Sequence, residues 1–141
     1  MSIYDSQNTN ISKRNSRKFR DIDLSFTRNT VTNDVNVVDD VVAIKRAVQN
    51  LVQTNYYERP FHPELGCSVA GLLFENNTPM TQRSIRKSVE EVIQNHEPRA
   101  EITQVDVTDG SDNNEYRVRI YFYVVNHTQQ EVFETYLTRT R

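Results

Sequence analysis

Apolar and polar residues alternate most regularly in the last third of the chain, and this alternation predicts an antiparallel sheet. Three strand candidates follow one another, Ala100 to Val107, Glu115 to Val125 and Gln130 to Thr138, and short polar turns connect them. Connections this short join antiparallel neighbours, so the strands should form a meander. The middle strand places its apolar side chains on a single face, which should pack against helices. These side chains are Tyr116, Val118, Ile120, Phe122 and Val124.

In the middle of the chain, apolar residues recur at helical spacing in two segments. Asp39 and Asp40 can cap a first helix and place negative charge in its first turn, and this helix should run to about Gln53. Thr78 can cap a second helix, with Pro79 at its first position, where a missing amide hydrogen costs nothing. Each helix has one apolar face. The apolar positions are Val41, Ile44, Val48, Leu51 and Val52 in the first helix and Ile85, Val89, Val92 and Ile93 in the second.

Three shorter segments complete the predicted secondary structure. Alternating residues from Phe19 to Phe26 and a β-branched run from Val31 to Val38 predict short extended segments, and a short helix is predicted over Val69 to Phe74. Helices and an antiparallel sheet in separate parts of the chain indicate the α+β class. We therefore expect a small single domain over residues 19–141, with an antiparallel C-terminal β-meander packed against two or three helices.

Residues 1–18 are polar and basic, and we expect them to form a disordered tail, because their few apolar side chains cannot offset the entropy of ordering. Residues 1–20 hold five basic residues against Asp5 alone, a formal charge of +4, which leaves −6 on the rest of a chain whose net charge is −2. A basic arm could bind nucleic acid, but without interleaved aromatic residues this is the weakest binding hypothesis. We favour an arm that orders only on assembly.

Several functional classes lack their usual features in this sequence. No apolar run approaches the roughly 20 residues that span a bilayer, and there is no apolar signal segment, so we expect a soluble protein without a membrane partner. The single cysteine, Cys67, fits folding in a reducing cytoplasm and should be buried. There is no glycine-rich phosphate loop, and the three histidines lie far apart, so neither a cofactor nor a metal site is expected.

Two carboxylates offer an enzymatic alternative. Glycoside hydrolysis needs two acids about 5 to 10 Å apart across a cleft, and Glu64 and Glu97 are the pair to test. Neither residue lies in an apolar run that would raise its pKa for acid catalysis. We therefore predict that the protein is not an enzyme, with a lysozyme-like cell-wall hydrolase as the alternative.

The segment from Asn95 to Arg99 joins the second long helix to the sheet. Pro98 lacks an amide hydrogen and biases Glu97 toward extended geometry, so the helix should end at about Asn95 or His96. Glu97 and Arg99 are then held in a stiff, extended kink. They are either solvated charges at a helix end or a pair presented to a partner, and the sequence leaves open whether they first brace each other.

The last predicted strand has apolar residues on both faces: Val132, Phe133, Tyr136 and Leu137. An exposed edge strand of this kind invites pairing with another chain. The alternative is an ordinary edge strand whose second face is covered by the N-terminal segment.

Four features together resemble the baseplate wedge proteins of contractile-tailed bacteriophages, the gene-25-like family that includes the type VI secretion baseplate homologue. They are the loop from Arg59 to Gly66, the Leu-Leu-Phe-Glu run from Leu72 to Glu75, an amphipathic helix, and the Glu-Pro-Arg kink that leads into strands. The resemblance covers about residues 38–138. The family loop is closer to Gly-Glu-Arg-x-x-x-Pro-x-Phe-Gly, and here Leu65 stands in place of its phenylalanine, whereas the Glu-Pro-Arg signature is intact.

The resemblance implies a structural role in the virion, at the tail baseplate, with assembly in the host cytoplasm. Glu97, Pro98 and Arg99, together with Arg59, would contact neighbouring wedge proteins near the tail tube. The last strand, through Val132, Phe133, Tyr136 and Leu137, would start the tail sheath by strand addition, with six copies around the tail axis.

Overall fold

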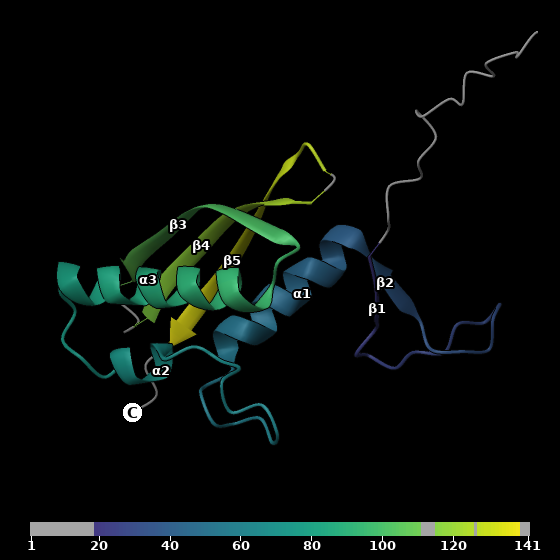
Figure 1. The fold of residues 1–141 in the computed structure, drawn as a ribbon, viewed down its shortest axis with the longest axis horizontal. Coiled ribbons are helices and arrows are strands. Elements are labelled where there is room, and N and C mark those ends of the chain that lie inside the picture. Colours follow the sequence, from purple (N-terminus) through teal and green to yellow (C-terminus); the bar gives the residue numbers. More distant parts are fainter. Residues whose placement is uncertain (1–18, 111–114, 126, 139–141) are drawn as a thin grey trace, which may run out of the picture.

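Three helices lie on one side of a three-stranded sheet, and a separate two-stranded hairpin stands beside them (Figure 1). The computed structural model describes residues 19–110, 115–125 and 127–138. The predicted tail over residues 1–18 lies outside the described residues. In chain order the elements are β1 (Arg20–Ile22), β2 (Val37–Asp39), α1 (Asp40–Gln53), α2 (Val69–Leu72), α3 (Pro79–His96), β3 (Ala100–Gly110), β4 (Glu115–Val124) and β5 (Gln130–Thr138).

The central strand β4 pairs antiparallel with β3 and with β5, which confirms the meander and the α+β class. Its alternating side chains from Tyr116 to Val124 are buried, whereas its other face is partly exposed. The strand β3 continues past the predicted end at Val107, because its pairing with β4 extends to the match of Gly110 with Glu115. Burial on one face only is what the alternating pattern predicted.

The helix α3 begins and ends as the sequence predicted. Thr78 occupies the N-cap position, and its hydroxyl accepts a hydrogen bond from the Thr81 amide at 3.2 Å. At the other end, the Glu97 amide donates to the Ile93 carbonyl at 2.8 Å and closes the last turn at His96. The short helix α2 stops at Leu72, before the predicted Phe74.

The start of α1 differs from the prediction in one respect. Asp39 occupies the N-cap position but makes no side-chain capping bond. Its carboxylate instead pairs with Arg20 at 3.1 Å, because the two residues face each other across the β1–β2 ladder. Asp40, in the first turn, accepts a hydrogen bond from the Phe19 amide at 2.9 Å. The aspartates therefore fasten the N-terminal segment to α1 rather than cap the helix.

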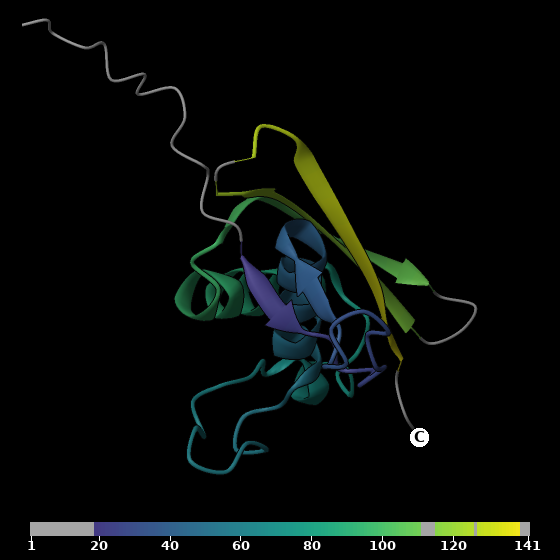
Figure 2. The ribbon, with the colours of Figure 1, turned by 90° about the vertical axis from the view of Figure 1, so that its right-hand side faces the viewer.

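The two predicted extended segments near the N-terminus are much shorter than expected. β1 and β2 have three residues each, and outside them one isolated bridge joins Arg28 to Val35. The apolar side chains that alternate along the first segment lie mostly in solvent, with exposed fractions of 62% for Ile22, 59% for Leu24 and 68% for Phe26. Figure 2 shows this hairpin next to α1, and Figure 1 shows it to one side of the three-stranded sheet, so the described part of the chain leaves much of its apolar surface exposed.

The core lies between the helices and the sheet and contains Ile44, Val48, Ile85, Val89 and Phe122. Cys67 belongs to it and is fully buried, as predicted. Its sulfur lies 3.4 Å from the Ser88 hydroxyl. Burial raises the pKa of the Cys67 thiol, which reduces the thiolate available as a nucleophile.

We expect iodoacetamide to alkylate the Cys67 thiol more slowly in the native protein than in the denatured chain at pH 8. The two rates should differ by roughly two orders of magnitude or more. Mass spectrometry of timed samples, with and without denaturant, measures both rates. Equal rates in the two conditions would contradict the buried position.

Candidate functional site

The kink between α3 and β3 is a tight turn. Glu97 follows the helix with φ of −128° and ψ of 75°, outside the helical region that proline disfavours for the residue before it but short of a fully extended conformation. The Ala100 amide then donates to the Glu97 carbonyl at 3.1 Å, so Pro98 and Arg99 form a turn rather than the extended segment predicted after the helix. The Arg99 carbonyl accepts from the Val125 amide at 3.0 Å, which fastens the turn to the end of β4.

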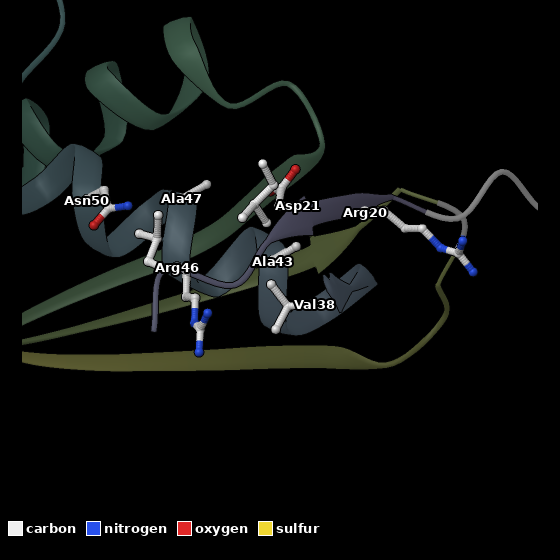
Figure 3. Close-up of a pocket in the computed structure, with 9 residues that line it drawn as sticks. Arg20, Asp21, Val38, Ala43, Arg46, Ala47 and Asn50 are labelled. Atoms are coloured by element: carbon white, nitrogen blue, oxygen red, sulfur yellow. The ribbon is translucent and has the colours of Figure 1, made fainter. Parts of the chain in front are cut away.

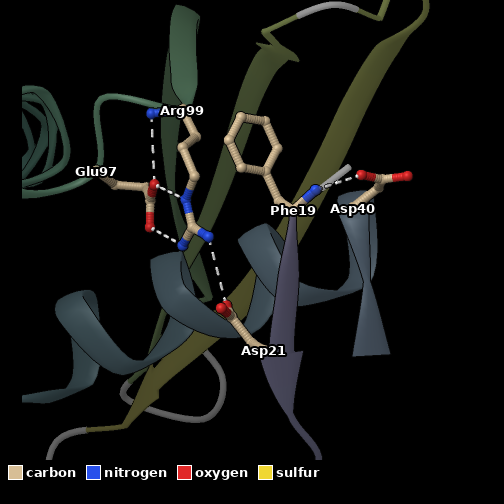
Figure 4. A network of polar contacts seen from close by, with 5 residues as sticks. All are labelled: Phe19, Asp21, Asp40, Glu97 and Arg99. Carbon is tan, nitrogen blue, oxygen red and sulfur yellow. Dashed lines mark hydrogen bonds and ion pairs between the residues drawn. The ribbon is translucent and has the colours of Figure 1, made fainter. Parts of the chain in front are cut away.

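Glu97 and Arg99 brace each other through a two-pronged ion pair (Figure 4). The Arg99 guanidinium donates from Nε to Glu97 Oε1 at 2.6 Å and from Nη2 to Oε2 at 2.7 Å. Glu97 as a residue is only 4% exposed. The Arg99 side chain remains 25% exposed. The carboxylate therefore points inward, and Arg99 and the exposed Pro98 are the parts of the kink that solvent reaches.

Arg99 also holds the N-terminal segment in place. Its guanidinium lies 5.5 Å from the centre of the Phe19 ring, and its Nη1 atom lies 3.5 Å from Asp21 Oδ2 (Figure 4). Hydrogen bonding to Glu97, followed by the nearby negative charges of Glu97 and Asp21, raises the pKa of Arg99. Neither Phe19 nor Asp21 was predicted to join this cluster, because a contact across 78 residues leaves no signal in local sequence patterns.

The loop between α1 and α2 carries Arg59, which is exposed. The same loop carries Glu64, whose Oε1 lies 3.1 Å from His62 Nδ1. A hydrogen bond to its own amide, and then the bond to His62, lower the pKa of Glu64. A catalytic acid needs a raised pKa, and both oxygens of the other candidate, Glu97, bind Arg99. The two carboxylates therefore lack the environment of a hydrolase site.

The strand β5 lies at the edge of the sheet. Val132 and Tyr136 point outward and are 43% and 48% exposed, whereas Leu137 is buried and Phe133 is partly buried against the core. The two apolar faces predicted for this strand are therefore present. Among the described residues, no N-terminal segment buries the outer pair.

An additional groove, which the sequence did not predict, lies between the hairpin and α1 (Figure 3). It has a volume of about 430 Å³. Its polar side chains are largely engaged elsewhere: Arg46 pairs with Asp23 at 2.6 Å, and Arg20 pairs with Asp39. The lining residues are Arg20, Asp21, Ile22, Leu24, Val38, Ala43, Arg46, Ala47 and Asn50.

In residues 19–110, 115–125 and 127–138, no group of three or more histidine, cysteine, aspartate or glutamate side chains is placed to hold a metal ion. Over the same residues, no helix has the length and apolar character needed to cross a membrane.

The fold and the kink together define a small α+β protein whose distinctive features are an internally braced Glu-Pro-Arg turn and an edge strand, β5, that no other described strand pairs with on its outer side. Residues 38–130 match the family model of baseplate wedge protein gp25. The chain therefore belongs to this family, as its sequence motifs indicated.

One relative and two solved structures illustrate the similarity. Baseplate wedge protein gp25 of Enterobacteria phage T4 is 34% identical over 85 residues, which is 60% of this chain and 64% of the T4 protein. The alignment thus spans less than two thirds of that protein.

A proposed tail lysozyme of Geobacter sulfurreducens has a similar fold, with a TM-score of 0.66 at 19% identity, over 71% of this chain and 91% of that one. A chain of the anti-feeding prophage baseplate has a TM-score of 0.60 at 19% identity, over 88% of each chain. At this level of identity, both comparisons concern the fold.

Breaking the Glu97–Arg99 pair should destabilise the domain unequally. Arg99→Met leaves the buried Glu97 carboxylate without its guanidinium partner, and we expect it to lower the free energy of unfolding by about 3 kcal/mol. Glu97→Gln keeps a hydrogen-bond acceptor and leaves a cation that water can reach, so we expect a loss of about 1 kcal/mol. Urea denaturation followed by circular dichroism measures both. An equal or reversed order would show that the carboxylate does not depend on Arg99.

Proposed function

We propose that this chain is a structural component of the baseplate wedge of a contractile phage tail, and that it resides in the virion. The observation that carries the proposal is the family match over residues 38–130, with 34% identity to the T4 wedge protein over 85 residues. An assembly role also agrees with the site, where two charges brace each other instead of converging on a cleft.

The first part of the proposed mechanism is docking on neighbouring wedge proteins through the kink. Pro98 and the exposed quarter of Arg99 form the accessible surface, while Glu97 acts from beneath by fixing the guanidinium. An arginine already held in place loses little conformational freedom when a partner binds it. Arg59, exposed on the loop between α1 and α2, would add a second cation to this contact.

The second part is initiation of the tail sheath by strand addition to β5. The outer edge of β5 has no partner strand among the described residues, and an incoming strand could form main-chain hydrogen bonds along this edge. Val132 and Tyr136 would pack against that strand on the outer face, and Phe133 and Leu137 hold β5 on the core. The sheath protein would supply the strand, the tail tube would lie nearby, and six copies would surround the axis, as the family resemblance implies.

Replacing both kink charges with apolar residues tests the docking step without leaving an unpaired buried charge. A Glu97→Met/Arg99→Met variant should stay within about 1 kcal/mol of the wild-type stability, because apolar residues of similar volume often replace a buried ion pair at little cost. We expect it to fold and to be absent from purified wedge complexes. Incorporation of this variant at the wild-type level would contradict docking through Arg99.

Charged residues on the outer face of β5 test strand addition. We expect a Val132→Lys/Tyr136→Glu variant to fold, because both side chains are exposed and a glutamate at position 136 stands opposite Arg117 on β4. It should reduce sheath polymerisation on assembled tails by an order of magnitude or more. The matched control is Tyr123→Lys, which adds a charge to the same face of the central strand, 38% exposed, away from the edge. Electron microscopy counts sheathed tails. Normal sheaths with the double variant, or equal loss with the control, would contradict the proposal.

A further inference from the structure

The loop from Thr54 to Gly66 is held in a defined shape by its own hydrogen bonds. The Cys67 amide donates to the Thr54 carbonyl at 2.7 Å and closes the base of the loop. Further out, the Tyr57 amide donates to the Pro63 carbonyl at 3.0 Å. Gly66, with φ of 143°, lets the chain pass against the backbone of Asn55, where any side chain would clash. The loop therefore has a defined conformation and presents an ordered surface.

Two aromatic residues in this loop combine unfavourable backbone geometry with exposure. Tyr57 has φ of 67° and is 85% exposed, and Phe61 has φ of 71° and is 96% exposed. The left-handed region is unfavourable for residues with a bulky side chain, and an exposed ring gains nothing from burial. Neither feature helps the isolated domain, so both indicate a surface that another molecule covers.

Beside Tyr57 lies a hollow of about 510 Å³ between the loop and the end of α3. Its chemistry is suited to a cation in three ways. The Glu64 carboxylate, which is ionised at neutral pH like any exposed glutamate, supplies a negative charge. The C-terminal end of α3, at Asn95 and His96, carries the negative end of the helix dipole. Tyrosine rings attract cations to their faces. The lining residues are Tyr56, Tyr57, Pro63, Glu64, Asn95 and His96.

We propose that this hollow receives an arginine side chain from a neighbouring protein. A guanidinium is planar, so it can stack on a tyrosine ring while it donates two parallel hydrogen bonds to a carboxylate. A lysine ammonium group is not planar, so it cannot stack flat on the ring and donate two parallel hydrogen bonds to the carboxylate at the same time. The inference rests on the proposed function only for the identity of the neighbour, which would be another baseplate protein.

Three cationic or titratable groups of the chain itself face or adjoin this site. His62 already bonds Glu64, His96 lines the hollow from α3, and Arg59 lies on the same loop. An incoming arginine therefore displaces His62 from Glu64 rather than filling an empty bond.

The test uses the isolated 141-residue protein and a small probe, N-acetyl-arginine amide, in a two-dimensional NMR titration at pH 7.5. The neutral isostere N-acetyl-citrulline amide is the control for non-specific effects. We expect the arginine probe to shift the amide resonances of Tyr56, Tyr57, Glu64 and His96, with a Kd on the order of 10 mM for a lone side chain. Citrulline should cause no saturable shift.

Two variants then locate the binding. Glu64→Gln should weaken the arginine response at least about fivefold, whereas Glu91→Gln, an exposed glutamate of α3 that does not line the hollow, should leave it unchanged. Equal shifts with citrulline, an unchanged response in Glu64→Gln, or no shift up to about 50 mM probe would overturn the proposal. Shifts confined to residues outside the hollow would overturn it as well.

This titration needs no baseplate, so its failure and the failure of the proposed function are distinguishable. If wedge assembly depends on the kink charges while the probe does not bind, the hollow has no role in recognising arginine. If the probe binds as expected but the kink variant assembles normally, the docking proposal fails and the arginine site stands.

Discussion

The Glu97–Arg99 ion pair is the interaction that joins the helices, the sheet and the N-terminal hairpin at one point, and neither charge can be removed alone without cost. A buried carboxylate is stable only when its charge is matched, and here both of its oxygens accept from one guanidinium. The pair spans a single proline at the point where α3 becomes β3. Because Arg99 also contacts Phe19 and Asp21, the same charge that neutralises Glu97 fixes where the N-terminal hairpin lies. The end of α3, the start of β3 and the N-terminal hairpin therefore all contact the single Arg99 cation.

Local patterns predicted the regular elements because each has one buried face. The periodicity of β4 and of α3, the Thr78 cap and the proline stop all act within a few residues, and all appear in the structure. The resemblance of the loop and the kink to a known family was likewise visible in short motifs, and the family match confirms it.

The remaining features depend on contacts between distant parts of the chain. An aspartate before a helix normally caps it, but Asp39 has a cross-strand arginine as a competing partner. The alternating run from Ile22 to Phe26 predicts a strand, yet the described residues leave its apolar side chains mostly exposed. The inward orientation of Glu97 follows from the position of Arg99, and neither the pairing with Asp21 nor the hollow beside Glu64 has a signature in the sequence.

The edge of β5 that no described strand covers also bears on how the chain behaves toward other copies of itself. Two copies that paired antiparallel about the middle of this nine-residue strand would bring Glu134 of each directly opposite the other. Each of these carboxylates already pairs with Arg119 at 2.9 Å and with Arg117 at 3.5 Å on β4, so the two like charges are largely compensated. Charge at the centre of the strand therefore does little to distinguish a second copy from a foreign strand.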